Sequence, residues 1–375
     1  MKKSMNKILT THTGSLPRPE DVQHLLAARD RGEQIDRVAF EARVREAVKE
    51  VVQRQASCGI DVVNDGEMSK ISYSTYVKDR LTGFDDRTAP SPSLRMDLPE
   101  FPGFAKRMGA VLRDYARPAC TGPISYRGKA DLERDIANLL AAVEEVNVTE
   151  VFMTAASPGV ISLFLANQYY PTHEAYLYAL AGAMKEEYEA IYQAGFLLQL
   201  DCPDLAIGMS GAGEANVPSL QLHLEALNYA VRDIPPDRLR LHLCWGNYEG
   251  PHHRDVPLQQ VIGEVLQARP VAVSFEGANP RHEHEWKVFE QIGLPQDKVI
   301  IPGVLDSTTN FIEHPELVAQ RLERYASVVG REQVIAGSDC GFATFAGLLT
   351  VDPDITWAKL ASMVEGARIA TDRLW

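Results

Sequence analysis

His242 and Cys244 are the residues that suggest chemistry most directly, because they stand two apart in the apolar segment LRLHLCWGN at Leu239–Asn247. Successive side chains of a β-strand point to opposite faces, so residues two apart point the same way. If the segment is a strand, His242 and Cys244 project together from its carboxyl end, where Gly246 and Asn247 begin a loop. An imidazole beside a thiolate is a ligand pair for a soft or borderline metal ion.

Two further potential ligands, Glu276 in SFEGAN and Cys340 in GSDCG, also follow apolar segments that resemble strands. The intervals from Cys244 to Glu276 and from Glu276 to Cys340 are close to one and two strand–helix units. Two thiolates, an imidazole and a carboxylate form a tetrahedral set that suits Zn²⁺. The sequence therefore predicts a zinc site with His242, Cys244, Glu276 and Cys340 as ligands.

Eight largely apolar segments, mostly followed by helical patterns, would position these side chains. Strands that are apolar on both faces and alternate with helices indicate a parallel sheet. We expect strands within residues 8–13, 59–68, 149–159, 195–204, 238–247, 271–280, 298–306 and 333–341. We expect helices at Pro19–Ala28 and Asp36–Ser57 and at about 172–194, 219–231, 258–268, 283–292, 314–329 and 356–373. Eight such units predict an α/β protein with a (β/α)8 barrel, in which functional residues follow the strands.

The rhythm breaks at about residues 82–147, where prolines are frequent and a polar helix begins at Ala130. We interpret this stretch as an insertion that carries a hairpin between the second and third strands of a single catalytic domain covering residues 1–375. A doubly wound open sheet is the alternative fold, but no GxGxxG follows the first strand.

Composition excludes several classes of protein. The net charge is -13 and no cluster of Lys and Arg stands out, which argues against nucleic-acid binding. No apolar run approaches the roughly 18 residues of a membrane span, and no secretory signal is visible, so we expect a cytoplasmic protein. Five widely spaced cysteines favour free thiols or metal ligands over disulfides. Of the three outside the predicted zinc site, Cys202 is interpreted as a substrate wall, and Cys58 and Cys120 as structural.

Zinc with two thiolate ligands activates water poorly, because the ligands' negative charge weakens its Lewis acidity. It is suited to binding an external thiol, whose pKa it lowers. A weakly held carboxylate such as Glu276 could lengthen its bond when the substrate sulfur arrives. The predicted reaction is thiol alkylation, in which a zinc-bound thiolate attacks an electrophilic carbon of an alkyl donor.

The motifs TTHTGSLPRP, NDGEM, LQLDCPDLA, HLCWGN, SFEGAN, IPGVLD and GSDCG together resemble the cobalamin-independent methionine synthase family in its short, single-barrel form. The resemblance covers essentially the whole chain. It implies a zinc-dependent transferase that makes methionine from homocysteine, with His242, Cys244, Glu276 and Cys340 as zinc ligands. It places homocysteine contacts at Gly14 and Ser15, Glu67 and Asp201.

The two acids also make sense from their positions. Glu67 and Asp201 end the second and fourth predicted strands and so face the same rim as the metal ligands. Together they could bind the ammonium of an amino-acid thiol, while the amide of Ser15 binds its carboxylate. We also assign Asp201 and Glu276 as catalytic residues. Helix N-capping is the alternative role for each acid. Asp65 is interpreted as a cap or orienting group, and Asp339 as a support for the metal ligands.

The chain departs from the family at several positions. It begins at the catalytic barrel, without the N-terminal barrel that helps the longer members bind folate. Thr308 stands where the family has a proton-donating histidine, and Ala206 and Ile207 replace an arginine-and-glutamate segment. These changes leave the methyl donor open between folate, methylcobalamin and another donor.

Two alternatives to methyl transfer remain. One is an epoxide-opening thiol transferase like epoxyalkane:coenzyme M transferase, a short relative, for which Arg18 and Lys70 could bind the sulfonate. The other is a non-catalytic zinc or thiol carrier. The histidines His252, His253, His282 and His284 lie in polar stretches where solvated surface is expected. The sequence does not define the oligomeric state.

Overall fold

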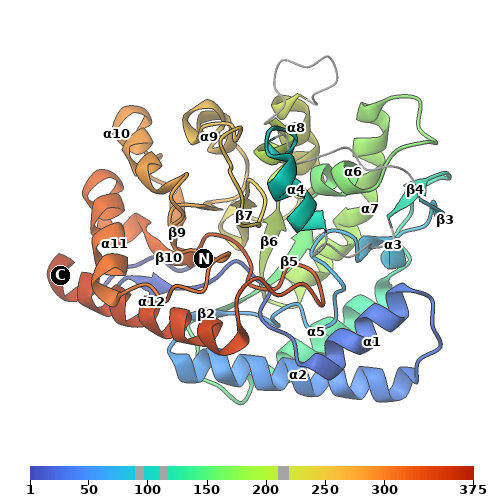
Figure 1. Cartoon of the computed structure of the whole chain (residues 1–375), viewed down its shortest axis with the longest axis horizontal. Coiled ribbons are helices and arrows are strands. Elements are labelled where there is room, and N and C mark those ends of the chain that lie inside the picture. Colours follow the sequence, from blue (N-terminus) through green and yellow to red (C-terminus); the bar gives the residue numbers. More distant parts are fainter. Residues whose placement is uncertain (89–96, 110–116, 210–218) are drawn as a thin grey trace.

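Eight parallel strands form the centre of the molecule, in a computed structural model that describes residues 1–88, 97–109, 117–209 and 219–375 (Figure 1). In hydrogen-bonded order they are β2 (Val62–Val63), β5 (Glu150–Ala156), β6 (Leu197–Asp201), β7 (Leu239–Leu243), β8 (Ala272–Phe275), β9 (Val299–Leu305), β10 (Ile335–Ser338) and β1 (Leu9–Thr10). Nearly all their residues are buried, as expected for strands that are covered on both faces. All eight lie within the predicted segments.

Individual hydrogen bonds of Asp61 and Thr11 join β1 to β2, because no ladder pairs these two strands within the described residues. The backbone amide of Asp61 donates to the carbonyl of Thr10 at 3.2 Å, and a carboxylate oxygen of Asp61 accepts from the amide of Thr10 at 3.0 Å. The hydroxyl of Thr11 donates to the carbonyl of Val62 at 3.0 Å. The strands therefore make a nearly closed barrel.

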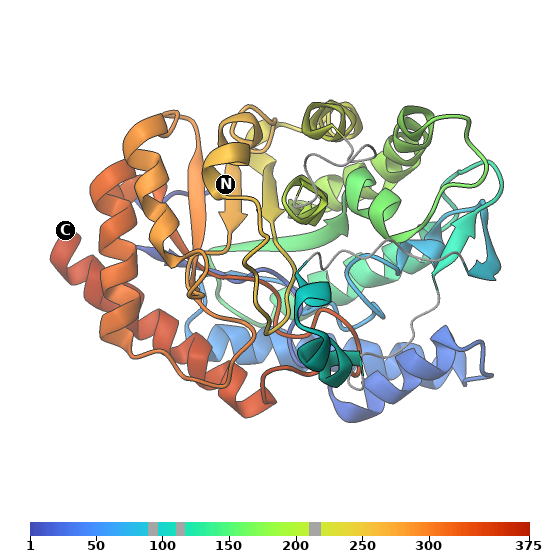
Figure 2. The ribbon, with the colours of Figure 1, turned by 45° about the horizontal axis from the view of Figure 1, so that its top comes forward.

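Eight helices surround the strands, each in contact with the next. They are α2 (Arg37–Cys58), α5 (Lys129–Val143), α7 (His173–Gln193), α8 (Leu220–Ala230), α9 (Leu258–Val265), α10 (Val288–Ile292), α11 (Pro315–Val329) and α12 (Pro353–Leu374). The red C-terminal α12 lies beside the blue α2, which closes the ring (Figure 2). With one helix for each strand, the predicted (β/α)8 barrel is confirmed.

Helix α2 illustrates how the sequence builds these elements. Its N-cap Asp36 accepts a hydrogen bond from the amide of Ala39 at 3.1 Å, and the left-handed Gly59 ends it. Phe40 and Val44 are buried against the barrel, as the helical spacing predicts.

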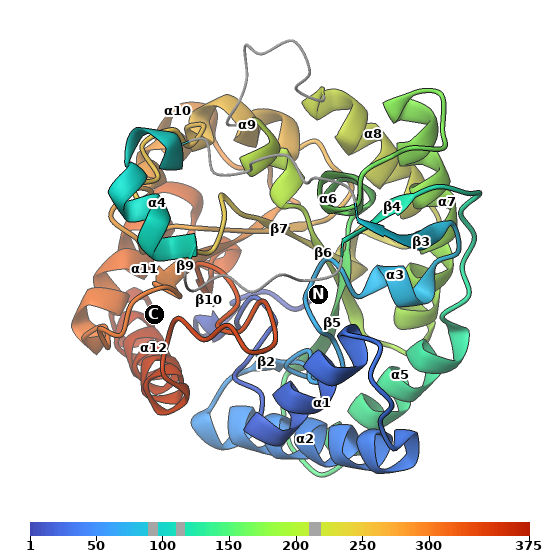
Figure 3. The same ribbon diagram turned by 45° about the vertical axis from the view of Figure 1, so that its right-hand side comes forward.

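A hairpin lies between β2 and β5, as predicted. Strands β3 (Phe84–Thr88) and β4 (Pro118–Cys120) pair antiparallel at the edge of the molecule, beside α3 (Val77–Arg80) and α7 (Figure 3). Helix α4 (Pro102–Gly109) also belongs to this stretch. Helix α5 lies within the predicted insertion at 82–147, but it contacts α2 and α7 and so occupies the position of the second barrel helix.

Helices α1 (Glu20–Asp30) and α6 (Pro158–Phe164), like α3 and α4, add to the basic barrel. Helix α1 packs on α2, and the short α6, which the sequence did not predict, follows β5. Among the described residues, no helix combines the length and apolar composition that crossing a membrane requires.

Candidate metal centre

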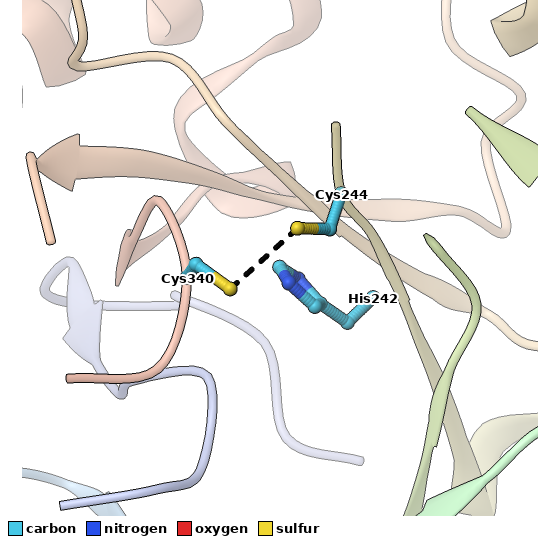
Figure 4. A group of neighbouring side chains, drawn as sticks. All are labelled: His242, Cys244 and Cys340. Atoms are coloured by element: carbon cyan, nitrogen blue, oxygen red, sulfur yellow. Dashed lines mark hydrogen bonds between the residues drawn. The ribbon is translucent and has the colours of Figure 1, made fainter. Parts of the chain in front are cut away.

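His242, Cys244 and Cys340 meet at the carboxyl end of the barrel strands (Figure 4). Their ligand atoms all lie within 4.8 Å of one another, and the two sulfurs are 3.6 Å apart. Two thiolates bound to one tetrahedral zinc at about 2.3 Å would have sulfurs about 3.8 Å apart, close to this spacing. His242, Cys244 and Cys340, from β7 and the loop after β10, therefore lie together, and their role as metal ligands remains a prediction.

The alternation of β7 explains why His242 and Cys244 point inward. Leu239, Leu241 and Leu243 are fully buried in the apolar core between strands and helices. The intervening Arg240 and His242 face the barrel interior, and the guanidinium of Arg240 donates to the hydroxyl of Thr11 at 3.1 Å. Cys244 continues this inward series just beyond the end of the strand.

The donor atoms of the trio suit a metal ion. Nδ1 of His242 lies 3.4 Å from the hydroxyl of Ser274, whereas its buried Nε2 has no hydrogen-bond partner among the described residues. Burial, followed by the charge of Arg240, lowers the pKa of His242 to about 3, so its imidazole is neutral and can donate a lone pair. The hydrogen bond with Cys340, followed by burial, raises the pKa of Cys244. A cation between the sulfurs would favour their thiolate forms.

Glu276 lies beside the trio but is not a member of the group of mutually close ligand atoms. One carboxylate oxygen accepts from the amide of Trp245 and the other from the side-chain amide of Asn279, both at 2.8 Å. Burial, followed by the charge of Cys244, raises the pKa of Glu276. Its role as a fourth ligand remains a prediction.

Glu67 and Asp201 lie on the same rim, after β2 and at the end of β6. One oxygen of Glu67 accepts from the hydroxyl of Thr154 at 2.8 Å, and the other is buried with no hydrogen-bond partner in the described part of the chain. Glu67 also has a positive φ of 58°, a strained backbone conformation that is common at functional sites. Asp201 accepts from the side-chain amide of Gln199 at 2.9 Å. Burial, followed by the charge of Glu67, raises the pKa of Asp201 to about 8.

The loop of Gly14 and Ser15 lies against both neighbouring loops. A Cβ on Gly14, whose φ is +151°, would lie 3.0 Å from a carboxylate oxygen of Glu67, so glycine allows the close approach. The carbonyl of Ser15 accepts from the amide of Phe342, two residues after Cys340. The loop therefore lies between Glu67 and the segment that follows Cys340, and its contact with a substrate remains a prediction.

Asp65 and Asp339, interpreted as supporting groups, accept hydrogen bonds from the backbone of loops beside the trio. Asp65 accepts from the amide of Glu67 at 3.0 Å. Asp339 accepts from the backbone amides of Gly277 and Ala278, both at 2.8 Å, and so supports the loop that carries Glu276.

All five cysteines are free, as expected. Cys202 is buried next to Asp201, and its amide donates to the carbonyl of His242 at 2.8 Å. Its assignment as a substrate wall remains a prediction.

Two of the histidines expected at the surface lie instead in a network behind Glu276. Only 2% of His282 is exposed, and its ring hydrogen-bonds Asp255 at 3.1 Å and Glu285 at 2.8 Å. His252 shares the same oxygen of Asp255 at 2.7 Å. Burial alone would lower the pKa of His282, but these carboxylates raise it to about 10. Glu285 follows His282 by three residues, but Asp255 comes from a separate loop, so local sequence alone did not indicate the burial of His282.

Sequence reasoning also missed Tyr73. Its ring makes edge contacts with Phe164 and Phe345, with centroids 5.9 Å apart in each case. Burial, followed by the charges of Cys244 and Cys340, raises the pKa of Tyr73, which indicates that the phenol lies near the trio. No pattern in the sequence distinguishes this tyrosine from a core residue.

Comparisons with known proteins find methionine synthases that are similar to this chain. Residues 8–90 match the family model described as the catalytic domain of cobalamin-independent synthase. The methionine synthase of Saccharolobus solfataricus is 24% identical over 97% of this chain and 95% of its own length. That of Pyrococcus furiosus is also 24% identical, over 96% of this chain and 91% of its own.

Two solved structures share the fold. A B12-independent methionine synthase from Shewanella sp. W3-18-1, in complex with selenomethionine, superimposes with a TM-score of 0.74 at 20% identity, covering 98% of this chain and 99% of the other. A putative vitamin-B12 independent methionine synthase from Listeria monocytogenes gives 0.67 at 21% identity, covering 97% and 99%.

Proposed function

We propose that this chain, which is similar to the cobalamin-independent methionine synthase family, transfers a methyl group to the sulfur of homocysteine, giving methionine, with zinc as its metal. The observation that carries the proposal is the pairing of two features on one rim. The trio of His242, Cys244 and Cys340 can hold a metal that binds sulfur, and the carboxylates of Glu67 and Asp201 can bind an ammonium. Homocysteine carries both a thiol, which the metal would bind, and an ammonium, which the carboxylates would bind.

His242, Cys244 and Cys340 would hold the zinc, with Glu276 as the candidate fourth ligand. Zinc bound there would supply the positive charge that lowers the pKa of an incoming thiol. Two cysteines and a histidine fit zinc better than magnesium or calcium, which prefer oxygen ligands.

Glu67 and Asp201 bind and orient the substrate in this proposal. The oxygen of Glu67 that lacks a hydrogen bond can accept one from the substrate ammonium. That positive charge would also favour the ionised form of Asp201, whose pKa the neighbouring Glu67 and burial have raised. The amide of Ser15 is the proposed donor to the substrate carboxylate. Fixing the amino acid at this end directs its sulfur toward the trio.

The reaction moves one methyl group between two atoms. The substrate loses its S–H proton, a sulfur–carbon bond forms, and the bond between the methyl carbon and the donor breaks, with its electron pair leaving on the donor. Thr308, at the position of the family's proton-donating histidine, donates its amide and hydroxyl to the carboxylate of Asp306, both at 2.8 Å. We therefore propose only that the donor is a methylated compound whose leaving group departs without a proton from that histidine.

The epoxide-opening alternative loses support from the basic residues proposed to bind a sulfonate. Arg18 donates to the backbone carbonyls of Glu67 and Ala343, and Lys70 donates to the carbonyl of Thr154 at 2.6 Å. A cytoplasmic location, and a single catalytic domain over the whole chain, remain part of the proposal.

The test replaces the metal with Co²⁺ and follows the visible spectrum while homocysteine or coenzyme M is added. We expect a stronger sulfur-to-metal band with homocysteine alone, and zinc in the protein as purified. Methionine formation is then measured with methyltetrahydrofolate and methylcobalamin as donors. A response to coenzyme M alone would favour epoxide opening, and no response to either thiol would exclude both assignments.

A further inference from the structure

The hydroxyl of Thr154 lies between a buried lysine and the acid proposed to bind the substrate ammonium, and the proposed reaction gives it no role. We propose that Thr154 is a positioning residue, which holds one oxygen of Glu67 and separates the acid from Lys70, so that the other oxygen stays available to the ammonium. The inference rests on the proposed function and deepens it, because it names a residue on which recognition of the amino group depends.

The two hydrogen bonds of the Thr154 hydroxyl have defined directions. The ammonium of Lys70 lies 3.1 Å from the hydroxyl oxygen and 2.6 Å from the backbone carbonyl oxygen of Thr154. Because an ammonium has only donors, the hydroxyl oxygen must accept from it. The hydroxyl proton is then directed to Glu67, whose Oε1 accepts it at 2.8 Å. A neutral group therefore stands between the cation and the carboxylate.

Lys70 and Glu67 form no direct ion pair within the described residues, although both side chains are almost completely buried. The ammonium of Lys70 lies instead over the ring of Tyr76, 4.5 Å from its centroid. A direct pair would offset the negative charge of Glu67, and the acid would then attract a second ammonium less strongly. The Thr154 hydroxyl thus keeps that charge for an incoming cation.

Packing fixes the orientation of the Thr154 side chain on β5. Its γ-methyl lies only 2.7 Å from the position that a Cβ on Gly14 would take, so the glycine makes room for it. A β-branched side chain has few accessible rotamers. With the methyl held against Gly14, the position of the hydroxyl is fixed as well.

The second oxygen of Glu67 is the one left for the substrate. It is buried and accepts no hydrogen bond from the described residues. The guanidinium of Arg18 is 3.9 Å away, which is beyond hydrogen-bonding distance, and it donates instead to the carbonyls of Glu67 and Ala343. Without the Thr154 hydroxyl, the carboxylate would be able to rotate or to accept from Lys70, and either change would weaken binding of the ammonium.

The experiment compares wild type with T154V and T154S, each as the full chain loaded with Co²⁺. Valine keeps the shape of threonine and lacks the hydroxyl, whereas serine keeps the hydroxyl. Two thiols are titrated, homocysteine and 4-mercaptobutanoate, which lacks only the amino group. In T154V, we expect the dissociation constant for homocysteine to rise about tenfold, the factor expected when one hydrogen bond to a charged group is lost. That for 4-mercaptobutanoate should change little, and T154S should retain most of the affinity for homocysteine.

The matched control is T356V. Thr356 is also buried, and its hydroxyl donates to the carbonyl of Asp352 at 3.1 Å within the outer helix α12. This variant should leave the dissociation constants of both thiols unchanged. In a Glu67→Gln background, T154V should add little to the loss of homocysteine affinity, because Thr154 acts through Glu67. Thermal unfolding of each variant checks that the fold is retained.

Three results would overturn the inference. T154V could bind homocysteine as tightly as wild type, or lose affinity for both thiols equally, which would show a general structural role. T154S could also lose as much affinity as T154V, and the hydroxyl would then not be responsible. If wild type binds neither thiol, the proposed function fails and the inference fails with it. If wild type binds homocysteine and T154V matches it, only the inference fails.

Discussion

Replacing Glu67 with Gln tests whether its buried carboxylate recognises the substrate ammonium. The amide oxygen of Gln can still accept the 2.8 Å hydrogen bond from Thr154, so the shape of the site is retained. What is lost is the charge on the oxygen that has no hydrogen-bond partner within the described residues. The substitution therefore removes the charge that would face the ammonium, and with it the 3.9 Å ion pair between the same oxygen and the guanidinium of Arg18.

The size of the effect follows from the burial of Glu67, which is 2% exposed. A hydrogen bond to a charged group contributes roughly 1.5–3 kcal/mol, which corresponds to a factor of about 10 to 150 in binding. We expect the KM for homocysteine to rise by such a factor. The variant should be less stable than wild type, because the buried guanidinium of Arg18, 3.9 Å from that oxygen, loses the opposite charge beside it.

The assay measures KM for two thiols, homocysteine and 4-mercaptobutanoate, which lacks only the amino group. Glu67→Gln should raise KM for the first and leave the second nearly unchanged. An equal effect on both thiols, or none on homocysteine, would refute the assignment of Glu67 to the ammonium. Circular dichroism during thermal unfolding provides the control for folding.

Three further predictions concern the metal, the pH dependence and the packing of the site. Cys340→Ser should lower zinc affinity and abolish methyl transfer; full activity in a variant shown by metal analysis to lack zinc would contradict the mechanism. Burial raises the pKa of Asp201 from its ordinary value of 3.8 to about 8, so between these values the folded protein holds a proton that the unfolded chain has released. The free energy of unfolding must then fall as pH rises through this window. Asp201→Asn should reduce the fall between pH 5 and pH 8, as measured by denaturant titration. An unchanged fall in the variant would show that Asp201 does not cause the pH dependence. Gly303→Ala would place its Cβ 2.0 Å from Asp339 and should lower the free energy of unfolding by about 1–3 kcal/mol or more. The control is Gly182→Ala, where the new Cβ would meet no neighbouring atom within 4 Å and should stabilise α7 by about 0.5–1 kcal/mol. Similar effects of the two substitutions in urea unfolding would disprove the steric argument.

The barrel and the metal trio could be predicted because both depend on short-range periodicity. Residues two apart on a strand share a face, which sufficed to pair His242 with Cys244. The regularity of a parallel barrel then placed Cys340 on the same rim.

Periodicity was less reliable where a pattern only partly fits. Val38 is an apolar residue within the helical pattern of Asp36–Ser57, but it is 79% exposed in α2. It precedes Val44 by six residues, which at about 100° per residue turns it roughly 120° away from the buried face.

The remaining features depend on contacts between distant segments. His282 is buried by Asp255 and Glu285, and the adjacent loop is held by Asp97, whose carboxylate accepts from the hydroxyl of Tyr248 at 2.7 Å. Glu285 is three residues from His282, but Asp255 is 27 residues from it and Asp97 is 151 residues from Tyr248, so those two contacts have no recognisable spacing. Local polarity therefore predicted an exposed histidine where the fold makes a buried ion network.

A bound substrate would also stabilise the barrel at the join between β1 and β2. Hydrogen bonds between Asp61 and Thr10 replace a ladder there, so this join should open more readily than the rest of the barrel in native-state hydrogen exchange. Ser15 follows β1 and Glu67 follows β2, so a bound amino acid that contacts both residues would link the two strands. Ligand binding would then slow amide exchange on both sides, and the amino-acid end of the substrate would help to close the barrel that holds it.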